Sequence, residues 1–141
     1  MSMRKIAYSP KGLVHFSVGA IIKKGEKYLL IDRANIPEGF ACIAGHMEPG
    51  ENPEQAIIRE IKEESKLDAR ECKLLFEETL YKNICSDGIE NHHWYIFECN
   101  VKGQEKNNEE AKSIGWYAPS EIKNLKLEST WQHFLKKAGI I

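Results

Sequence analysis

The chain has 141 residues, enough for one domain with a hydrophobic core, and we expect a single domain over residues 1–141. Its formal net charge of −1 gives no bulk electrostatic reason to bind nucleic acid or an anionic membrane. No apolar run reaches the roughly 20 residues that span a bilayer, and the N-terminus lacks the apolar segment of a signal peptide, so the sequence predicts a cytoplasmic protein.

The first part of the chain predicts a hairpin followed by an irregular segment. Residues 15–22 are rich in apolar and β-branched residues, residues 23–26 include a turn glycine, and residues 27–32 form the returning strand. Residues 34–50 carry Pro-Glu-Gly and Glu-Pro-Gly. We therefore expect an ordered loop there, around a short apolar piece at residues 40–44.

A helix is predicted to follow this loop. Asn52 is a suitable N-cap, Pro53 fits the first helical position, and the helix is expected to end near Ser65 or Lys66. At about 100° per residue, its apolar stripe consists of Ile57, Ile58 and Ile61, and its solvent face carries Gln55, Arg59 and Glu63.

The rest of the chain alternates strands with polar connections. Strands are predicted at residues 73–81, 92–101 and 114–117, and polar connections at residues 82–91 and 102–108. A helical turn at residues 120–124 precedes a helix at residues 129–138, which is capped by Ser129, ended by Gly139 and buried through Trp131, Phe134 and Leu135. These elements predict an α/β (α+β) fold in which helices pack on a mixed sheet.

The cysteines do not form a recognisable metal or redox motif. Cys42, Cys72, Cys85 and Cys99 contain no Cys-x-x-Cys pair, which excludes a zinc ribbon or a thioredoxin-type motif. We expect reduced thiols that mostly pack in the interior. A zinc site assembled from distant Cys and His side chains stays open, without a motif to support it.

Three glutamates are the most informative residues of the predicted helix. Glu60, Glu63 and Glu64 are spaced so that they lie on one side within a turn, where like charges raise one another's pKa. Glu60 and Glu64 flank the apolar stripe, and two such carboxylates can reach one Mg²⁺ ion, which prefers oxygen ligands. Glu63 can instead pair with Arg59 at i, i+4. The alternative interpretation is a solvated acidic face.

Residues 45–67, GHMEPGENPEQAIIREIKEESKL, resemble the box of the Nudix (MutT-like) hydrolases, which reads G-x5-E-x7-R-E-U-x-E-E-x-G-U with U aliphatic. The positions that match in register are Gly45, Glu51, Arg59, Glu60, Ile61, Glu63, Glu64 and Leu67. Lys66 departs from the pattern, because it stands where the family has glycine. The resemblance implies a Nudix-type α/β/α sandwich.

The resemblance also implies a reaction and its ligands. Nudix enzymes hydrolyse a nucleoside diphosphate linked to another moiety, and a small chain of this kind looks most like a (deoxy)nucleoside triphosphate pyrophosphatase that uses Mg²⁺ or Mn²⁺. The implied metal ligands are Glu60, Glu63, Glu64 and a backbone carbonyl of Ala44 or Gly45; the implied catalytic residues are Glu63, Glu64 and Glu110. Glu109 is the alternative to Glu110. Glu51 and Arg59 resemble a structural charge pair that ties the loop to the helix.

Lys66 lies at the predicted helix C-terminus, where the glycine of the family permits a left-handed cap. A lysine in that conformation costs on the order of 1 kcal/mol. Either the helix continues toward Asp68, or the strain is tolerated.

Substrate contacts are less constrained by the sequence. The candidates are Arg33 for phosphates, Phe40 and Tyr81 for base stacking, and His46, which follows the box glycine. His92 and His93 are adjacent in a predicted strand, so they point to opposite faces and cannot bind one metal as a pair.

Two other functional classes stay open. A non-catalytic Nudix domain that senses a nucleotide usually lacks box glutamates, whereas all three are present here. A Nudix-fold isomerase acting on an allylic diphosphate needs a catalytic cysteine, and Cys42 lies just before the box. The expected partner is a nucleotide or nucleoside-diphosphate substrate; no nucleic acid or membrane partner is expected, and a homodimer stays open.

Overall fold

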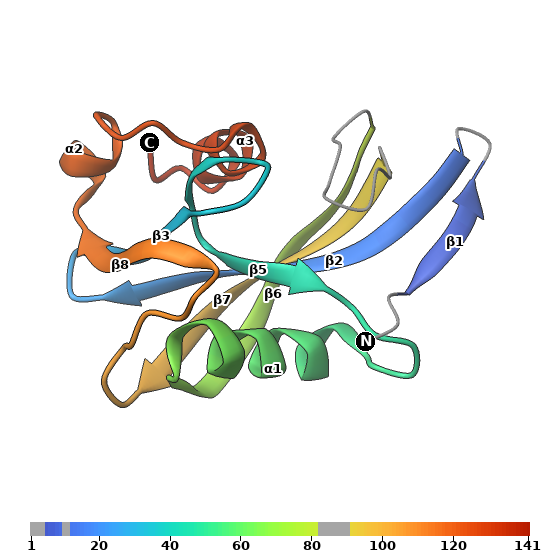
Figure 1. Ribbon diagram of the computed structural model, residues 1–141, viewed down its shortest axis with the longest axis horizontal. Coiled ribbons are helices and arrows are strands. Elements are labelled where there is room, and N and C mark those ends of the chain that lie inside the picture. The colour runs from blue at the N-terminus through green and yellow to red at the C-terminus, as the bar shows by residue number, and fades with distance from the viewer. Residues whose placement is uncertain (1–4, 10–11, 82–90) are drawn as a thin grey trace.

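The computed structural model describes residues 5–9, 12–81 and 91–141, in which helices pack on both faces of a mixed sheet (Figure 1). The strands are β1 (Ile6–Ser9), β2 (Gly12–Lys24), β3 (Lys27–Arg33), β4 (Gly39–Ala41), β5 (Ile43–His46), β6 (Asp68–Leu80), β7 (Asn91–Lys102) and β8 (Ala111–Tyr117). The helices are α1 (Pro53–Ser65), α2 (Pro119–Ile122) and α3 (Ser129–Lys137). The expected α/β fold is confirmed. The predicted connection at residues 82–91 falls, apart from its last residue, outside the described residues, as does Cys85.

The other strands are arranged around β2. It pairs in parallel with β7, from Val14 opposite Asn91 to Ile22 opposite Cys99. Along its other edge, β2 pairs antiparallel with β1 near its start and with β5 further along. The last residues of β2 form the expected hairpin with β3. β6 extends the sheet beyond β7, while β3 also pairs with β4 and β8. Because β2 contacts so many partners, its pleat decides which residues share a face.

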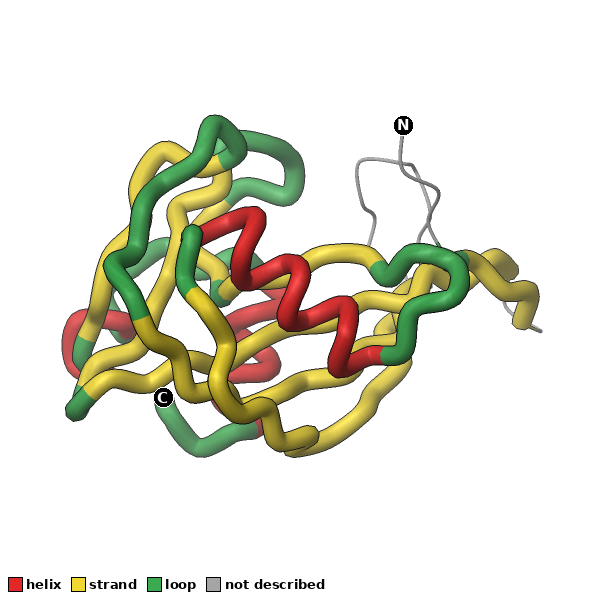
Figure 2. Tube along the Cα trace, turned by 90° about the horizontal axis from the view of Figure 1, so that it is seen from below, coloured by secondary structure: helices red, strands yellow, loops and turns green. Residues whose placement is uncertain are grey.

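Alternate residues of β2 supply two different cores. Val18, Ala20 and Ile22 lie in the core under α1, whereas Ile21 lies in the core under α3. Gly19 also faces α3, where a Cβ would overlap the ring of Trp131. Figure 1 shows α1 and α3 on opposite sides of the sheet, and Figure 2 shows α1 crossing the strands. The predicted burial of Trp131, Phe134 and Leu135 is confirmed.

Residues 34–50 were expected to form an ordered loop around a short apolar piece at residues 40–44, and the two strands β4 and β5 within this segment were not predicted. β4 pairs with β3 and β5 pairs with β2, so the chain changes partner at Cys42. Strands this short carry no clear alternation of their own, and distant strands decide their conformation.

The strand β4 has a second neighbour that is not a strand. Phe40 forms a parallel bridge with Leu127. The Phe40 N–H donates to the Lys126 carbonyl at 2.9 Å, and the Phe40 carbonyl accepts from the Glu128 N–H at 2.9 Å. The segment before α3 is therefore hydrogen-bonded to β4.

Several predicted boundaries are also corrected. β6 begins at Asp68 rather than residue 73, because its first residues pair with the end of β7, and β1 was not predicted at all. The N-cap of α3 is Glu128 rather than Ser129. The carboxylate of Glu128 accepts from the Thr130 N–H at 3.1 Å.

The helix α1 begins and ends near the predicted residues. Asn52 and Gln55 form a capping box, in which each side chain accepts the backbone N–H of the other, at 2.8 and 3.0 Å. At the other end, Lys66 adopts a left-handed conformation with φ of 65°, and its N–H donates to the Lys62 carbonyl at 3.0 Å. Of the two alternatives at Lys66, tolerated strain is therefore the correct one.

The apolar stripe of α1 is narrower than predicted. Ile57 and Ile61 are fully buried, but Ile58 is 42% exposed and does not belong to the stripe. Helix residues one position apart differ by about 100° in direction, so β2 and β5 cover Ile57 without covering Ile58.

The described cysteines behave as packing residues. Cys42 and Cys99 are buried and Cys72 is half-buried, and all three are free thiols. Cys72 lies opposite Cys99 in the β6–β7 pair, with 2.9 Å between the two sulfur atoms. Among the described helices, none has the length and apolar character to cross a bilayer.

Replacing Lys66 with glycine is expected to raise the free energy of unfolding by about 0.5–1 kcal/mol, because relief of left-handed strain exceeds the added entropy of the unfolded chain. Urea unfolding measures the change. Lys62→Gly is the matched control, since it places glycine at an ordinary position of the same helix and should cost about 1 kcal/mol. Equal destabilisation by both variants would contradict strain at Lys66.

Candidate active site

Two glutamates of α1 turn toward the neighbouring strand β5. Glu60 and Glu64 are only 9% and 8% exposed. One carboxylate oxygen of Glu64 accepts the backbone N–H of Ala44 at 3.1 Å. The next residue, Gly45, lies against the carboxylate of Glu60, which a Cβ at this position would overlap. A glycine at position 45 therefore lets a carboxylate of the helix approach the strand.

Arg59 joins the loop before α1 to the helix. Its Nε and Nη2 atoms donate to the two carboxylate oxygens of Glu51 at 2.7 and 2.9 Å. Its Nη2 also donates to the backbone carbonyl of His46 at 3.0 Å, while Nη1 donates to Glu60 at 2.8 Å and to Glu63 at 3.2 Å. This bidentate contact agrees with the expected charge pair. The expectation that Arg59 lies on the solvent face is wrong, because its side chain is only 23% exposed.

The electrostatics of the two buried glutamates are unfavourable for a pair of anions. Burial raises the pKa of Glu60 to about 7, against the lowering effect of Arg59 and with further raising by Glu63 and Glu110. Burial also raises the pKa of Glu64 well above its usual value, and the charge of Glu60 adds to this effect. By contrast, the hydrogen bond from Arg59 lowers the pKa of Glu51. A cation between Glu60 and Glu64 would favour their ionised forms.

The remaining acidic candidates lie at the rim of this pair. The side chain of Glu63 is 56% exposed, and its backbone carbonyl accepts from the Asn108 side chain at 3.1 Å. Asn108 also accepts the Glu110 N–H at 2.9 Å. Glu110 is exposed, yet close enough for its charge to raise the pKa of Glu60 and of Glu64. Asn108 was not predicted, because its role depends on a loop meeting a helix far away in sequence.

The substrate candidates are distributed over different places. Arg33, at the end of β3, is near the carboxylates, because its charge lowers the pKa of Glu64. Phe40 packs against Tyr117 on β8, with ring centroids 5.7 Å apart. Tyr81 is exposed just after β6.

His46 is the substrate candidate that the structure places differently from the expectation. Side chains alternate along a strand, so His46 points to the opposite face of β5 from Gly45. Its ring lies beside the rings of His15 and His92, with centroids 4.3 and 5.6 Å away. His15 was not predicted as part of any site, because its proximity to the other two depends on the register of three strands.

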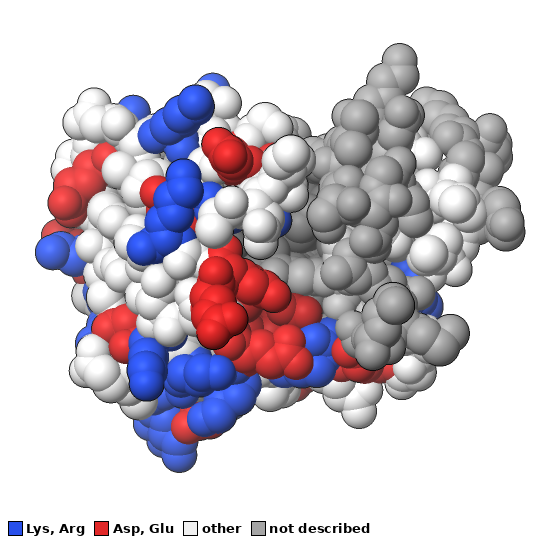
Figure 3. All heavy atoms as spheres, in the orientation of Figure 1, with Lys and Arg blue, Asp and Glu red and all other residues white. Residues whose placement is uncertain are grey.

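An acidic patch lies on the surface where β5 runs beside α1. Figure 3 shows a patch of Asp and Glu atoms on the face where β5 runs above α1. Basic side chains border the patch. An exposed acidic surface of this kind gives a cation direct access from solvent.

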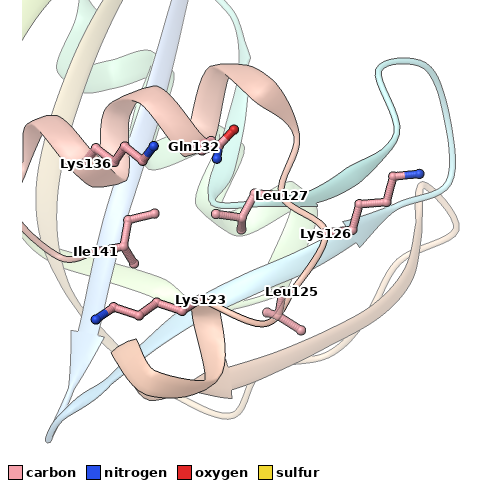
Figure 4. A pocket seen from close by; sticks show the side chains of 7 residues that line it. All are labelled: Lys123, Leu125, Lys126, Leu127, Gln132, Lys136 and Ile141. Atoms are coloured by element: carbon pink, nitrogen blue, oxygen red, sulfur yellow. The ribbon is translucent and has the colours of Figure 1, made fainter.

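A cavity of about 470 Å³ lies elsewhere, between α2 and α3 (Figure 4). Lys123, Lys126 and Lys136 line it, together with apolar residues such as Leu125 and Leu127. None of its lining side chains is a carboxylate, so these side chains provide no ligand set for a hard divalent cation. None of the predicted site residues lines it.

The environment of Cys42 bears on the isomerase alternative. Cys42 is 1% exposed, and burial raises the pKa of its thiol. A cysteine nucleophile reacts as the thiolate and needs an electropositive, accessible setting. Cys42 has the properties of a packing residue instead.

Known proteins resemble this chain in sequence and in fold. A family model described as the NUDIX domain matches residues 13–137. The nucleoside triphosphatase NudI of Enterobacter sp. (strain 638) is 32% identical over 132 residues, which cover 86% of this chain and 94% of that protein. The ADP-ribose pyrophosphatase of Methanocaldococcus jannaschii is 51% identical over 53 residues, which cover 36% of this chain and 31% of that protein.

The fold also matches solved structures. A MutT NUDIX hydrolase from Burkholderia pseudomallei superposes with a TM-score of 0.77 at 22% identity, covering 87% of this chain and 96% of that chain. At this identity the likeness concerns the fold, and it agrees with the expected sandwich.

The raised pKa values of Glu60 and Glu64 predict a pH dependence of stability without metal. The folded protein holds these protons more tightly than the unfolded chain, so the free energy of unfolding should fall as pH rises from about 4.5 through about 7. Urea unfolding in EDTA across this range measures the slope. Glu60→Gln should reduce the slope, whereas the exposed Glu109→Gln should not. A slope unchanged in Glu60→Gln would contradict the raised pKa.

Gly45→Ala is expected to displace the Glu60 carboxylate and to weaken Mn²⁺ binding roughly tenfold or more. Isothermal titration with Mn²⁺ measures the effect. Gly115→Ala is the matched control, because its Cβ would meet its nearest neighbour at an ordinary 3.4 Å and should leave binding unchanged. Wild-type affinity in Gly45→Ala would show that the approach of Glu60 to β5 is dispensable.

Proposed function

This chain belongs to the Nudix family, and we propose that it is a divalent-metal-dependent hydrolase of a nucleoside diphosphate linked to another moiety, most closely a (deoxy)nucleoside triphosphate. The observation that carries the proposal is the pair of buried carboxylates, Glu60 and Glu64, held against β5 beside the exposed acidic surface. Two carboxylates without a cation ordinarily avoid such burial, because loss of water disfavours their charged forms and each charge raises the pKa of the other.

The donor set fits Mg²⁺ or Mn²⁺. Enzymes of this family use divalent metals, and the side chains at this site offer only hard oxygen donors. In our proposal Glu60 and Glu64 would hold the ion, with Glu63 and a backbone carbonyl of Ala44 or Gly45 as further ligands. When bound, the ion supplies neutralisation of the charge that develops on the phosphate oxygens.

The residues around the pair would orient the ligands and move the proton. Arg59 binds Glu51 and Glu60 together, which supports a role in fixing the carboxylate of Glu60 rather than in binding substrate. Glu110 is the candidate to accept a proton from the attacking water. It lies near both buried carboxylates, yet is exposed enough to meet a water molecule. Arg33 is the nearby cation that could bind a phosphate of the substrate.

The choice of a triphosphate substrate is supported by how much of each relative's length the sequence match covers. The relative described as a nucleoside triphosphatase matches over almost its whole length, whereas the match to the ADP-ribose pyrophosphatase covers about a third of each chain. ADP-ribose is therefore the second substrate to test.

A nucleotide sensor without activity is the alternative function. Against it, Glu60, Glu63 and Glu64 are all present, and two of them are buried beside β5 as a metal site needs. A sensor would bind nucleotide without turnover, so the two proposals differ in a direct assay.

Glu64→Gln is expected to lower turnover roughly hundredfold or more, because it removes a charged ligand of the metal ion that would neutralise the charge developing on the phosphate oxygens. The assay is pyrophosphate or phosphate release with Mg²⁺ or Mn²⁺ from dNTPs, oxidised dGTP, ADP-ribose, dinucleoside polyphosphates and nucleotide sugars. Glu110→Gln should also lower turnover, and the adjacent Glu109→Gln is its matched control, with turnover expected within a few-fold of wild type.

Each outcome of this assay has a distinct meaning. Equal activity of wild type and Glu64→Gln would refute the metal assignment. Tight nucleotide binding without hydrolysis of any substrate would favour the sensor. A loss in Glu109→Gln but not in Glu110→Gln would exchange the roles of these two neighbours.

A further inference from the structure

Three histidines from three strands meet on the face of the sheet opposite α1. His15 on β2 pairs directly with His92 on β7, and Ser17, two residues along β2, pairs with His46 on β5. Side chains at positions 15 and 17 of β2 and at their paired positions project from the same face. One ring nitrogen from each imidazole can be chosen so that the three atoms lie within 4.8 Å of one another.

The cluster is built into the interior rather than scattered on the surface. His15 is 0% and His92 is 2% exposed, while His46, at the edge strand, is half-buried. Ser17 lies with its Oγ 3.3 Å from Nδ1 of His92. A hydroxyl in this place can hold the proton of one ring nitrogen and leave the other nitrogen as a ligand.

We propose that His15, His46 and His92 form a second metal site, for a transition metal of the Zn²⁺ class, on the opposite side of β5 from the carboxylates. Imidazole nitrogen suits Zn²⁺, Co²⁺ and Ni²⁺, whereas Mg²⁺ requires oxygen ligands. Three histidines with one remaining position form an established zinc ligand set. The two sites therefore differ in chemistry as well as in place.

The geometry needs only a small adjustment to close around a metal. Zn–N bonds of about 2.0–2.1 Å place tetrahedral donor atoms about 3.4 Å apart. Donors that lie within 4.8 Å of one another have to approach by no more than about 1.4 Å, which rotation of the side chains can supply.

The bound ion would also connect the sheet to the carboxylate site. It would link β5, β2 and β7 through side chains, and the backbone carbonyl of His46 accepts from Arg59 at 3.0 Å. Arg59 binds Glu51 and Glu60 in turn. Zn²⁺ at the histidines would thus fix the end of β5 on which Arg59 depends. This inference does not rest on the proposed hydrolysis.

Zinc binding by the metal-stripped protein tests the site directly, with excess Mg²⁺ present to occupy the carboxylates. Competition with a chelating dye should give one tightly bound Zn²⁺ per chain. His46→Phe should weaken binding at least roughly tenfold, because phenylalanine keeps a ring against His15 and removes the nitrogens. His93→Phe is the matched control on the other face of β7 and should bind as wild type.

The carboxylate variant Glu60→Gln separates the two sites. It should retain zinc binding, whatever its effect on hydrolysis. Absence of tight Zn²⁺ binding in wild type, or equal binding by wild type and His46→Phe, would overturn the proposal. Loss of binding in Glu60→Gln with retention in His46→Phe would place the zinc at the carboxylates, and would also overturn it.

Two further measurements guard against a folding defect in the variants. Zn²⁺ should raise the Tm of wild type and of His93→Phe but not of His46→Phe. Co²⁺ should give the intense visible absorption of a four-coordinate nitrogen site in wild type, and Ser17→Ala should weaken Co²⁺ binding roughly tenfold, as for a residue that positions a ligand. A six-coordinate Co²⁺ spectrum unaffected by Ser17→Ala would contradict the site.

Discussion

A single guanidinium group holds the functional region of this protein together. Arg59 binds both oxygens of Glu51 in the preceding loop, the carbonyl of His46 at the end of β5, and Glu60 on its own helix. Each of these acceptors belongs to a different part of the chain, and the planar guanidinium fixes them in one geometry. The loop could otherwise move independently of α1, and Glu60 would lose the partner that offsets its burial.

The sequence was sufficient wherever local chemistry decides the structure. The capping box at Asn52, the proline that follows it and the register of the box residues depend on spacings within one segment. The features that the sequence did not predict depend on contacts between distant segments. β4 and β5 exist because β3 and β2 pair with them, and the exposure of Ile58 reflects how the sheet covers one side of the helix.

The residues of the candidate site also divide into those that local spacing predicted and those that depend on distant contacts. The glutamates of α1 were predictable, because they share one helix turn. Asn108, which joins the loop of Glu110 to the backbone of Glu63, and His15, which meets His46 and His92, were not. The contacts of Asn108 and His15 depend on strand register and on the placement of a loop. The spacing of residues in the sequence does not encode either. The pleat of β5 adds a further consequence, since Gly45 and His46 serve opposite faces of one strand.

The hydrogen bonds between Phe40 and the segment before α3 have a consequence for association between molecules. β4 lies at one end of the strand order, and residues 126–128 already occupy backbone groups through which another strand could add. At the other end, β6 carries charged residues such as Arg70, Glu71, Lys73 and Glu77. Charged side chains discourage pairing of sheet edges. The β4 end of this strand order is thus closed by its own chain and the β6 end carries charge, so addition of a strand from another molecule is opposed at these two ends.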